Sequence, residues 1–118
     1  MSISAWALAA AAALIAVIIV TKQLGGTKMS ANGVREQIES GAKIIDVRSP
    51  EEYRHGAYPG AVNIPLPELP KRIAEIPRDK PVVFYCRSGS RSAMATRTLR
   101  QAGYTNVVNA GGLGDMPR

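Results

Sequence analysis

Two kinds of apolar pattern divide the sequence. From Ile3 to Val20 the residues are almost wholly apolar, and no charged side chain precedes Lys22. Beyond this segment, short continuous apolar runs alternate with amphipathic stretches. Short apolar runs are typical of buried strands, and apolar residues three or four positions apart are typical of helices that cover a sheet. The second part of the chain is therefore predicted to be an α/β domain, and the first part needs a separate interpretation.

Four runs in the second part are predicted to be strands. They are residues 43–47, 61–64, 81–85 and 106–109. Helices are predicted between them, at residues 30–41, 50–53, 68–76 and 92–102. Strands that alternate with helices pair in parallel through right-handed crossovers, which predicts a small parallel sheet flanked by helices. Sites in such sheets form beyond the carboxyl ends of the strands, so Asp46 and Cys86 are expected on one rim.

The apolar segment Ile3–Val20 is predicted to be a membrane anchor. As a helix it is about 27 Å long, close to the roughly 30 Å of a bilayer's hydrocarbon layer. A cleaved signal peptide is the alternative, but no Lys or Arg precedes the segment and the residues after Val20 form a poor cleavage site. Positive flanks stay in the cytoplasm. We expect an uncleaved single-pass helix in the cell inner membrane, with a cytoplasmic domain; export after cleavage is the alternative.

The chain is accordingly predicted to consist of three parts. They are an anchor at residues 1–24, a linker at 25–29 and a single domain at 30–118. The net charge of +6 suits a small anionic substrate or an anionic surface. Nucleic acid is not expected as a partner, because there is no binding motif and only 5% of the residues are aromatic. A single cysteine excludes an intramolecular disulfide.

That cysteine, Cys86, follows the third predicted strand and precedes the best predicted helix. The loop between them reads Cys-Arg-Ser-Gly-Ser-Arg. Nearby cations, a helix N-terminus and inward-pointing backbone N–H groups all favour the thiolate, which is the nucleophilic form of cysteine. Gly89 can adopt the positive φ that turns N–H groups inward, and Arg91 can hold two oxygens of a tetrahedral anion. The loop therefore predicts a nucleophile beside an oxyanion site, and not an inert buried thiol.

Four segments, in order, resemble the motifs of the single-domain rhodaneses, the thiosulfate and persulfide sulfurtransferases. They are Ile45–Tyr53, Pro59–Leu66, Cys86–Ser92 and Gly103–Gly112. The resemblance covers about residues 29–116. It implies the rhodanese fold and the transfer of sulfane sulfur from thiosulfate or a related donor to a thiophilic acceptor. With one cysteine in the chain, the acceptor has to be external, such as cyanide or a thiol. No metal or other cofactor is expected.

The resemblance also implies a role for each residue of the loop. Cys86 carries the sulfur as a persulfide, which the backbone N–H groups of the loop hold. The side chains of Arg87 and Arg91 bind the anionic donor. The predicted substrate-binding residues are Arg87, Ser88, Gly89, Ser90 and Arg91. Asp46 and Arg48 either position the loop through charge pairs or form a plain salt bridge at a strand end.

Two departures from the family pattern accompany this resemblance. His55 lies before Gly56 and not after it, so we expect a surface residue and not a base. Met116 occupies a position where the family often has tryptophan.

Two other functions compete with sulfur transfer. Cysteine-based phosphatases and arsenate reductases of related architecture place five residues between the cysteine and the arginine, whereas four separate Cys86 from Arg91. Non-catalytic binding modules of this fold typically lose one of these two residues, and this chain keeps both.

Overall fold

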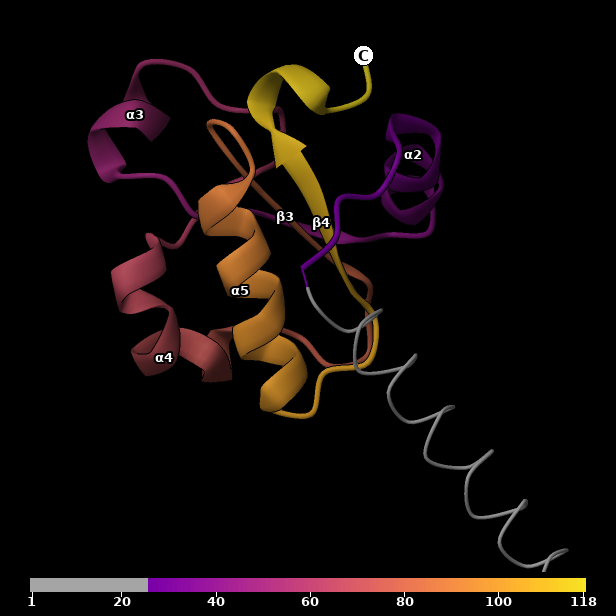
Figure 1. Ribbon diagram of the computed structural model, residues 1–118, viewed down its shortest axis with the longest axis vertical. Helices are drawn as coiled ribbons and strands as arrows, with labels where there is room; N and C mark the ends of the chain where they lie inside the picture. The colour runs from indigo at the N-terminus through magenta and orange to yellow at the C-terminus, as the bar shows by residue number, and fades with distance from the viewer. Residues whose placement is uncertain (1–25) are drawn as a thin grey trace, which may run out of the picture.

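The computed structural model describes residues 26–118 (Figure 1). The predicted anchor lies outside the described residues, and none of the helices in residues 26–118 is long and apolar enough to cross a membrane. Four strands form one sheet in the order β2-β1-β3-β4, and all of their pairings are parallel. The strands are β1 (Lys43–Asp46), β2 (Val62–Asn63), β3 (Val82–Cys86) and β4 (Val107–Gly112). This confirms the predicted α/β class and parallel sheet.

Helices connect the strands at the places the sequence predicts. They are α2 (Ala31–Glu39), α3 (Pro50–Arg54), α4 (Leu69–Arg72) and α5 (Ser90–Gln101). Short 3-10 turns occur at Leu66–Glu68, Ile73–Glu75 and Leu113–Asp115. Ser30 caps α2 by accepting a hydrogen bond from the Gly33 N–H at 3.2 Å. Ser49 and Glu52 form a reciprocal capping box at the start of α3, which fixes this short helix beside the end of β1.

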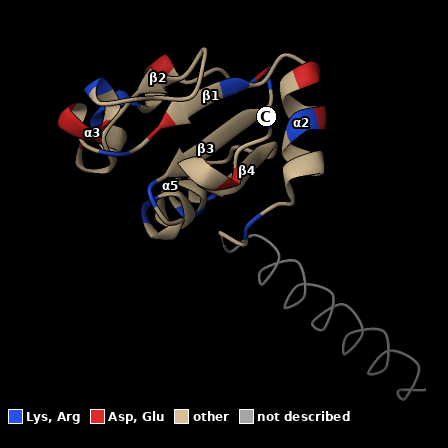
Figure 2. Cartoon of the chain, turned by 90° about the horizontal axis from the view of Figure 1, so that it is seen from above, with Lys and Arg blue, Asp and Glu red and all other residues tan. Residues whose placement is uncertain are grey.

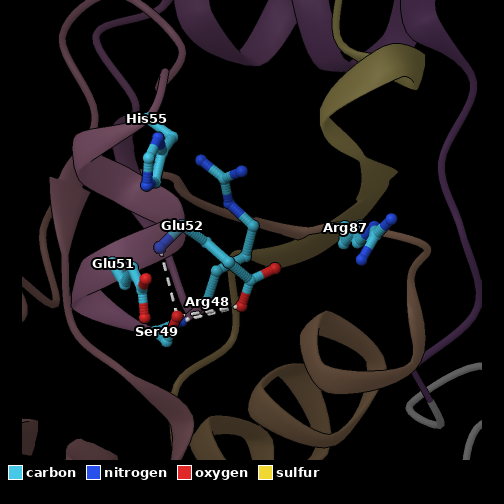
Figure 3. Close-up of a pocket in the computed structure, with 6 residues that line it drawn as sticks. All are labelled: Arg48, Ser49, Glu51, Glu52, His55 and Arg87. Carbon is cyan, nitrogen blue, oxygen red and sulfur yellow. Dashed lines mark hydrogen bonds between the residues drawn. The ribbon is translucent and has the colours of Figure 1, made fainter.

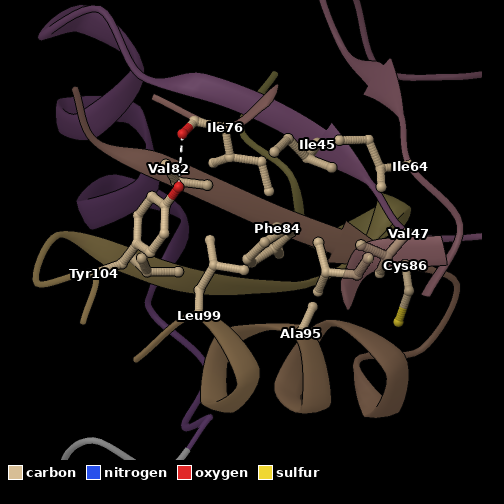
Figure 4. Close-up of a cluster of buried hydrophobic side chains, with 12 residues drawn as sticks. Ile45, Val47, Ile64, Ile76, Val82, Phe84, Cys86, Ala95, Leu99 and Tyr104 are labelled. Carbon is tan, nitrogen blue, oxygen red and sulfur yellow. Dashed lines mark hydrogen bonds between the residues drawn. The ribbon is translucent and has the colours of Figure 1, made fainter. Parts of the chain in front are cut away.

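The sheet separates two apolar layers because side chains alternate along β3, which is buried throughout. One layer is formed with α4 and α5 and contains Phe84, Leu69 and Leu99, as Figure 4 shows in part. The other layer contains Val34 of α2 and Tyr85 of β3. Figure 2 shows α2 and α5 on opposite sides of the strands β3 and β4. Cys86 is the last residue of β3 and belongs to the α5 layer, so its sulfur faces the first turn of that helix (Figure 4).

Two elements differ from the prediction. Residues 68–76 do not form one helix, since α4 ends at Arg72 and a 3-10 turn follows. Arg72, with φ of −115° and ψ of 13°, leaves the α-helical backbone geometry at this point. β4 continues to Gly112 with a shift of register, where a loop was predicted. A side chain at Gly112 would lie 2.3 Å from the Arg87 carbonyl oxygen, so only glycine lets the strand run this close to the loop.

Candidate active site

The predicted loop joins β3 to α5 and wraps around the sulfur of Cys86. Gly89 has φ of +105°, a conformation that is readily available only to glycine. In this conformation the Gly89 N–H donates a hydrogen bond to Cys86 Sγ at 2.9 Å. Cys86 itself is 1% exposed. The structure thus brings one of the predicted loop N–H groups onto the sulfur.

Ser92, in the first turn of α5, also lies next to the sulfur. It was not among the site residues predicted from the sequence. It is fully buried, and its Oγ lies 3.5 Å from Cys86 Sγ. The same hydroxyl lies within hydrogen-bonding distance of Asn109 Oδ1, the Gly89 carbonyl and the Gly111 carbonyl. The place of Ser92 at the start of a predicted helix, six residues after Cys86, is the one sequence signal for a position near the sulfur.

These surroundings change the acidity of the Cys86 thiol. Burial raises its pKa, because the charged form loses water. Hydrogen bonds oppose this and lower the pKa below its ordinary value: one from the Ser92 side chain, when its proton is directed at the sulfur, and others from the Ser92, Gly89 and Ser88 backbone. From the sequence, the two arginines were also expected to lower the pKa of Cys86. In the structure, hydrogen bonds make the larger contribution to this lowering.

Arg91 lies at the start of α5, but its guanidinium already has a partner. It makes two hydrogen bonds to the Glu52 carboxylate of α3, at 2.7 and 3.1 Å. This pairing lowers the pKa of Glu52 to about 2, opposed by partial burial and assisted by hydrogen bonds from Ser49. It also raises the pKa of Arg91, to which the charge of Cys86 adds a smaller contribution. The motif Ser-Pro-Glu-Glu predicts the capping box, but nothing in it reveals that Glu52 meets Arg91.

A cavity of about 340 Å³ lies between α3 and the loop. Figure 3 shows its lining, which comes from Arg48, Ser49, Glu51, Glu52, His55 and Arg87. Arg87 is exposed and makes no ion pair within the described residues. His55 is exposed, as expected, and it also borders this cavity. Cationic and anionic side chains therefore share one hollow beside the loop of the nucleophile.

Asp46 and Arg48 form a buried pair, with Arg48 Nη2 2.6 Å from Asp46 Oδ2. Tyr85, which precedes the nucleophile, donates its hydroxyl to the same carboxylate at 2.8 Å. Burial and this carboxylate raise the pKa of Tyr85 to about 12, against a lowering by the Tyr58 N–H. Arg48 also donates to the Gly56 carbonyl. In residues 26–118 no hydrogen bond joins the pair to the loop itself, so it ties the end of β1 to β3 and to the segment after α3.

The family model for the rhodanese-like domain matches residues 30–114. The chain belongs to the rhodanese-like family. This confirms the family that the four sequence motifs predicted.

Two sulfurtransferases are among the relatives of the chain. Thiosulfate sulfurtransferase PspE of Escherichia coli is 49% identical over 74 residues, which are 61% of this chain and 71% of PspE. A sulfurtransferase of Allochromatium vinosum is 45% identical over 69 residues, which are 58% of this chain and 64% of that protein. The chain thus spans less than two thirds of the length of this second rhodanese relative.

A solved structure shows the same fold. The structure of a rhodanese with anions from E. coli aligns with a TM-score of 0.60 and 45% identity. It covers 64% of this chain and 94% of that one. This likeness confirms the rhodanese fold that the sequence motifs implied.

Proposed function

We propose that the protein transfers sulfane sulfur from thiosulfate, through a persulfide on Cys86, to an external nucleophile. The Cys86 thiolate attacks the outer sulfur of thiosulfate, a new S–S bond forms, and the S–S bond of the donor breaks to release sulfite. The negative charge then rests on the terminal sulfur of the persulfide. An acceptor such as cyanide or a thiolate attacks that sulfur, leaves with it, and restores the Cys86 thiolate.

The contact between the Gly89 N–H and Cys86 Sγ, at 2.9 Å, is the observation that carries this proposal. It shows that the loop already curls around the sulfur, with the backbone donor directed inward. An N–H concavity of this kind stabilises an anion without having to rearrange during the reaction. A terminal persulfide sulfur is such an anion. That PspE is a thiosulfate sulfurtransferase supports thiosulfate as the donor class.

The cavity beside the loop supports an external acceptor. Its lining offers the free guanidinium of Arg87 and the imidazole of His55 together with the Glu51 carboxylate. Cations attract an anionic donor, and a mixed lining also accepts a small molecule that carries both signs of charge, as many thiols do. We propose this cavity as the place from which donor and acceptor approach Cys86.

The direct test is the intact mass of the protein after incubation with thiosulfate. One added sulfur is expected, and cyanide should remove it as thiocyanate. Cys86→Ser should abolish both steps while the circular dichroism spectrum stays unchanged. Sulfur loading that persists in Cys86→Ser would refute the proposal.

A further inference from the structure

Asn109 has a buried side-chain amide in β4, and both the oxygen and the nitrogen of this amide form hydrogen bonds. It is 3% exposed. Its Oδ1 accepts from the Ser92 hydroxyl at 2.6 Å and from the Gly111 N–H at 2.8 Å, and its Nδ2 donates to the Gly26 carbonyl at 2.7 Å. The two backbone partners fix the amide orientation, because an N–H can only donate and a carbonyl can only accept. The amide oxygen therefore faces Ser92.

The Ser92 hydroxyl has one proton and several acceptors around it. Asn109 Oδ1 is at 2.6 Å, the Gly89 and Gly111 carbonyl oxygens are at 3.0 and 3.3 Å, and Cys86 Sγ is at 3.5 Å. Hydroxyl hydrogen bonds to oxygen are strongest near about 2.7 Å, so the geometry gives the proton to Asn109. The lone pairs of Ser92 Oγ are then left to face the sulfur. They suit a thiol S–H, which can donate to them, but they do not stabilise a thiolate.

A hydrogen bond from the Ser92 hydroxyl to Sγ would have different effects on the free thiolate and on the persulfide. In the free enzyme the negative charge lies on Cys86 Sγ, where a hydrogen bond from Ser92 would stabilise it. In the persulfide the charge has moved to the terminal sulfur, and Sγ has become a neutral sulfur bonded to Cβ and to that terminal sulfur. A hydrogen bond from Ser92 to Sγ would therefore favour the free thiolate over the persulfide.

We propose that Asn109 is a positioning residue for sulfur transfer, which holds the Ser92 hydroxyl proton away from Cys86 Sγ and so keeps the thiolate reactive and the persulfide favoured. This inference rests on the proposed function. Gly26, two residues before the Lys28 that bridges to Asn109, contributes by holding the amide in the required orientation. The hydrogen bonds that do stabilise the thiolate come from the backbone of the loop.

Charged groups around Cys86 act independently of this chain of hydrogen bonds. Arg91 of α5 interacts with the charge of the sulfur, and Glu52 of α3 partly neutralises Arg91. Arg87 lies next to Cys86 in the loop. No hydrogen bond in the described part of the chain joins these three residues to Asn109. Replacing Asn109 therefore tests the hydroxyl proton and leaves the neighbouring charges in place.

The test is the pH dependence of Cys86 alkylation by iodoacetamide in the full-length protein. Asn109→Ala removes the nearest acceptor of the Ser92 proton, and the thiolate then competes for it with the neutral Gly89 and Gly111 carbonyls as the charged, stronger acceptor, so the midpoint should fall by roughly half a pH unit or more. The thiolate then becomes a weaker nucleophile, and thiosulfate loading measured above both midpoints should slow about 1.6- to 1.8-fold for each half unit by which the midpoint falls. Asn109→Asp provides a stronger acceptor of similar shape and should raise the midpoint.

The direction of the shift separates this proposal from a purely structural role. If Asn109 only supported packing, its loss would loosen the loop and move the midpoint upward, toward that of an ordinary thiol. A midpoint that rises or stays unchanged in Asn109→Ala, or that falls in Asn109→Asp, would overturn the proposal. Alkylation needs no sulfur donor, so this outcome is independent of whether thiosulfate is the substrate.

Two further variants serve as controls. In a Ser92→Ala background, Asn109→Ala should shift the midpoint no further, because there is no hydroxyl proton to release; a further shift would also overturn the proposal. Asn106→Ala makes the same substitution at an exposed asparagine just before β4 and should leave the midpoint where it is.

Discussion

Arg87 and Arg91 lie on either side of the loop that holds the sulfur, but an incoming anion meets them differently. The charge of Arg91 is partly neutralised by Glu52, and that of Arg87 has no such partner within the described residues. Arg87 is exposed at the cavity. Arg91 uses two of its N–H groups on Glu52, which leaves its other three for a ligand. We infer that Arg87 attracts the donor, whereas Arg91 orients it and also holds α3 against α5.

The first prediction at this scale compares the two arginines. Arg91→Ala removes a charge-assisted hydrogen bond to the donor, worth about 1.5–3 kcal/mol, and should lower kcat/KM for thiosulfate roughly ten- to hundredfold. Arg91→Lys should recover little, because an ammonium lacks the planar fork. Arg87→Ala should act mainly through KM.

Arg97→Ala provides the control, because Arg97 is exposed on the same helix as Arg91. It should leave the thiosulfate kinetics unchanged. Steady-state kinetics of the four variants, with thermal unfolding measured in parallel, make the comparison. Unchanged kinetics in both Arg91→Ala and Arg87→Ala would mean that the donor binds elsewhere.

The role of a single residue could be predicted from the sequence where its residue type has few possible roles. A lone cysteine at the end of a buried strand and the glycine of its loop are of this kind. The partners Glu52, Ser92 and Asn109 could not be predicted in their roles. Each contacts a site residue that is remote from it in the sequence, and polar residues of these types occur throughout the chain. Their positions follow from the packing of α3, α5 and β4 against one another.

At the scale of elements, the loop of Cys86 packs closely against the end of β4 because residue 112 is a glycine. A Cβ at Gly112 would lie 2.3 Å from the Arg87 carbonyl oxygen, whereas one at Gly114 would meet nothing within 4 Å. Gly112→Ala should therefore push the loop away from its position and reduce sulfur loading at least about tenfold. Gly114→Ala should load at the wild-type rate. Equal loading rates in the two variants would show that the loop does not depend on this close approach.

The contact between α3 and α5 predicts a pH-dependent stability. The pKa of Glu52 is about 2 in the folded protein, below its ordinary value of 4.5. Its ion pair with Arg91 thus stabilises the fold at neutral pH, and this contribution is lost as the pH falls from about 5 to 2. The pair is partly exposed, so we expect about 1 kcal/mol from it.

Urea unfolding of Glu52→Gln and wild type at several pH values measures this contribution. The free energies of unfolding should differ most near neutral pH and converge progressively as the pH falls from about 5 to 2. Glu51→Gln, which changes the exposed neighbour, should show no such convergence. A difference that stays constant between pH 7 and 3 would contradict the assigned role of the ion pair.

Most elements could be predicted, because hydrophobic periodicity directly reflects which residues face the core. The exceptions are instructive. The stretch 68–76 has a helical spacing of Leu69, Ile73 and Ile76, but the backbone leaves α-helical geometry at Arg72, which divides the stretch into shorter turns. β4 was predicted to end before its glycines, because glycine usually ends a strand pattern. Here the glycines extend the strand, since the loop of Cys86 packs directly on it.

At the scale of the whole molecule, we propose that residues 3–20 anchor the domain in the membrane with its active site in the cytoplasm. Attachment through apolar burial should withstand high salt and alkali, because screening does not weaken it. Deletion of residues 1–24 should release a soluble, active domain. Membrane fractionation of both forms tests the anchor. A mature N-terminus near Gly25 would instead indicate a cleaved signal peptide, and labelling of Cys86 from outside intact cells would reverse the topology.

The parallel sheet also determines when the site can first exist. Each ladder joins strands that are separated by a crossover, and β4 comes last among the four in chain order. During synthesis the chain leaves the ribosome from its N-terminus at about 5–20 residues per second, so Cys86 emerges before the strand that carries Asn109 and Gly112. The nascent chain therefore presents an ordinary thiol without its hydrogen-bonding shell. Uptake of sulfur by Cys86 at its full rate is therefore expected only after the last strand has docked.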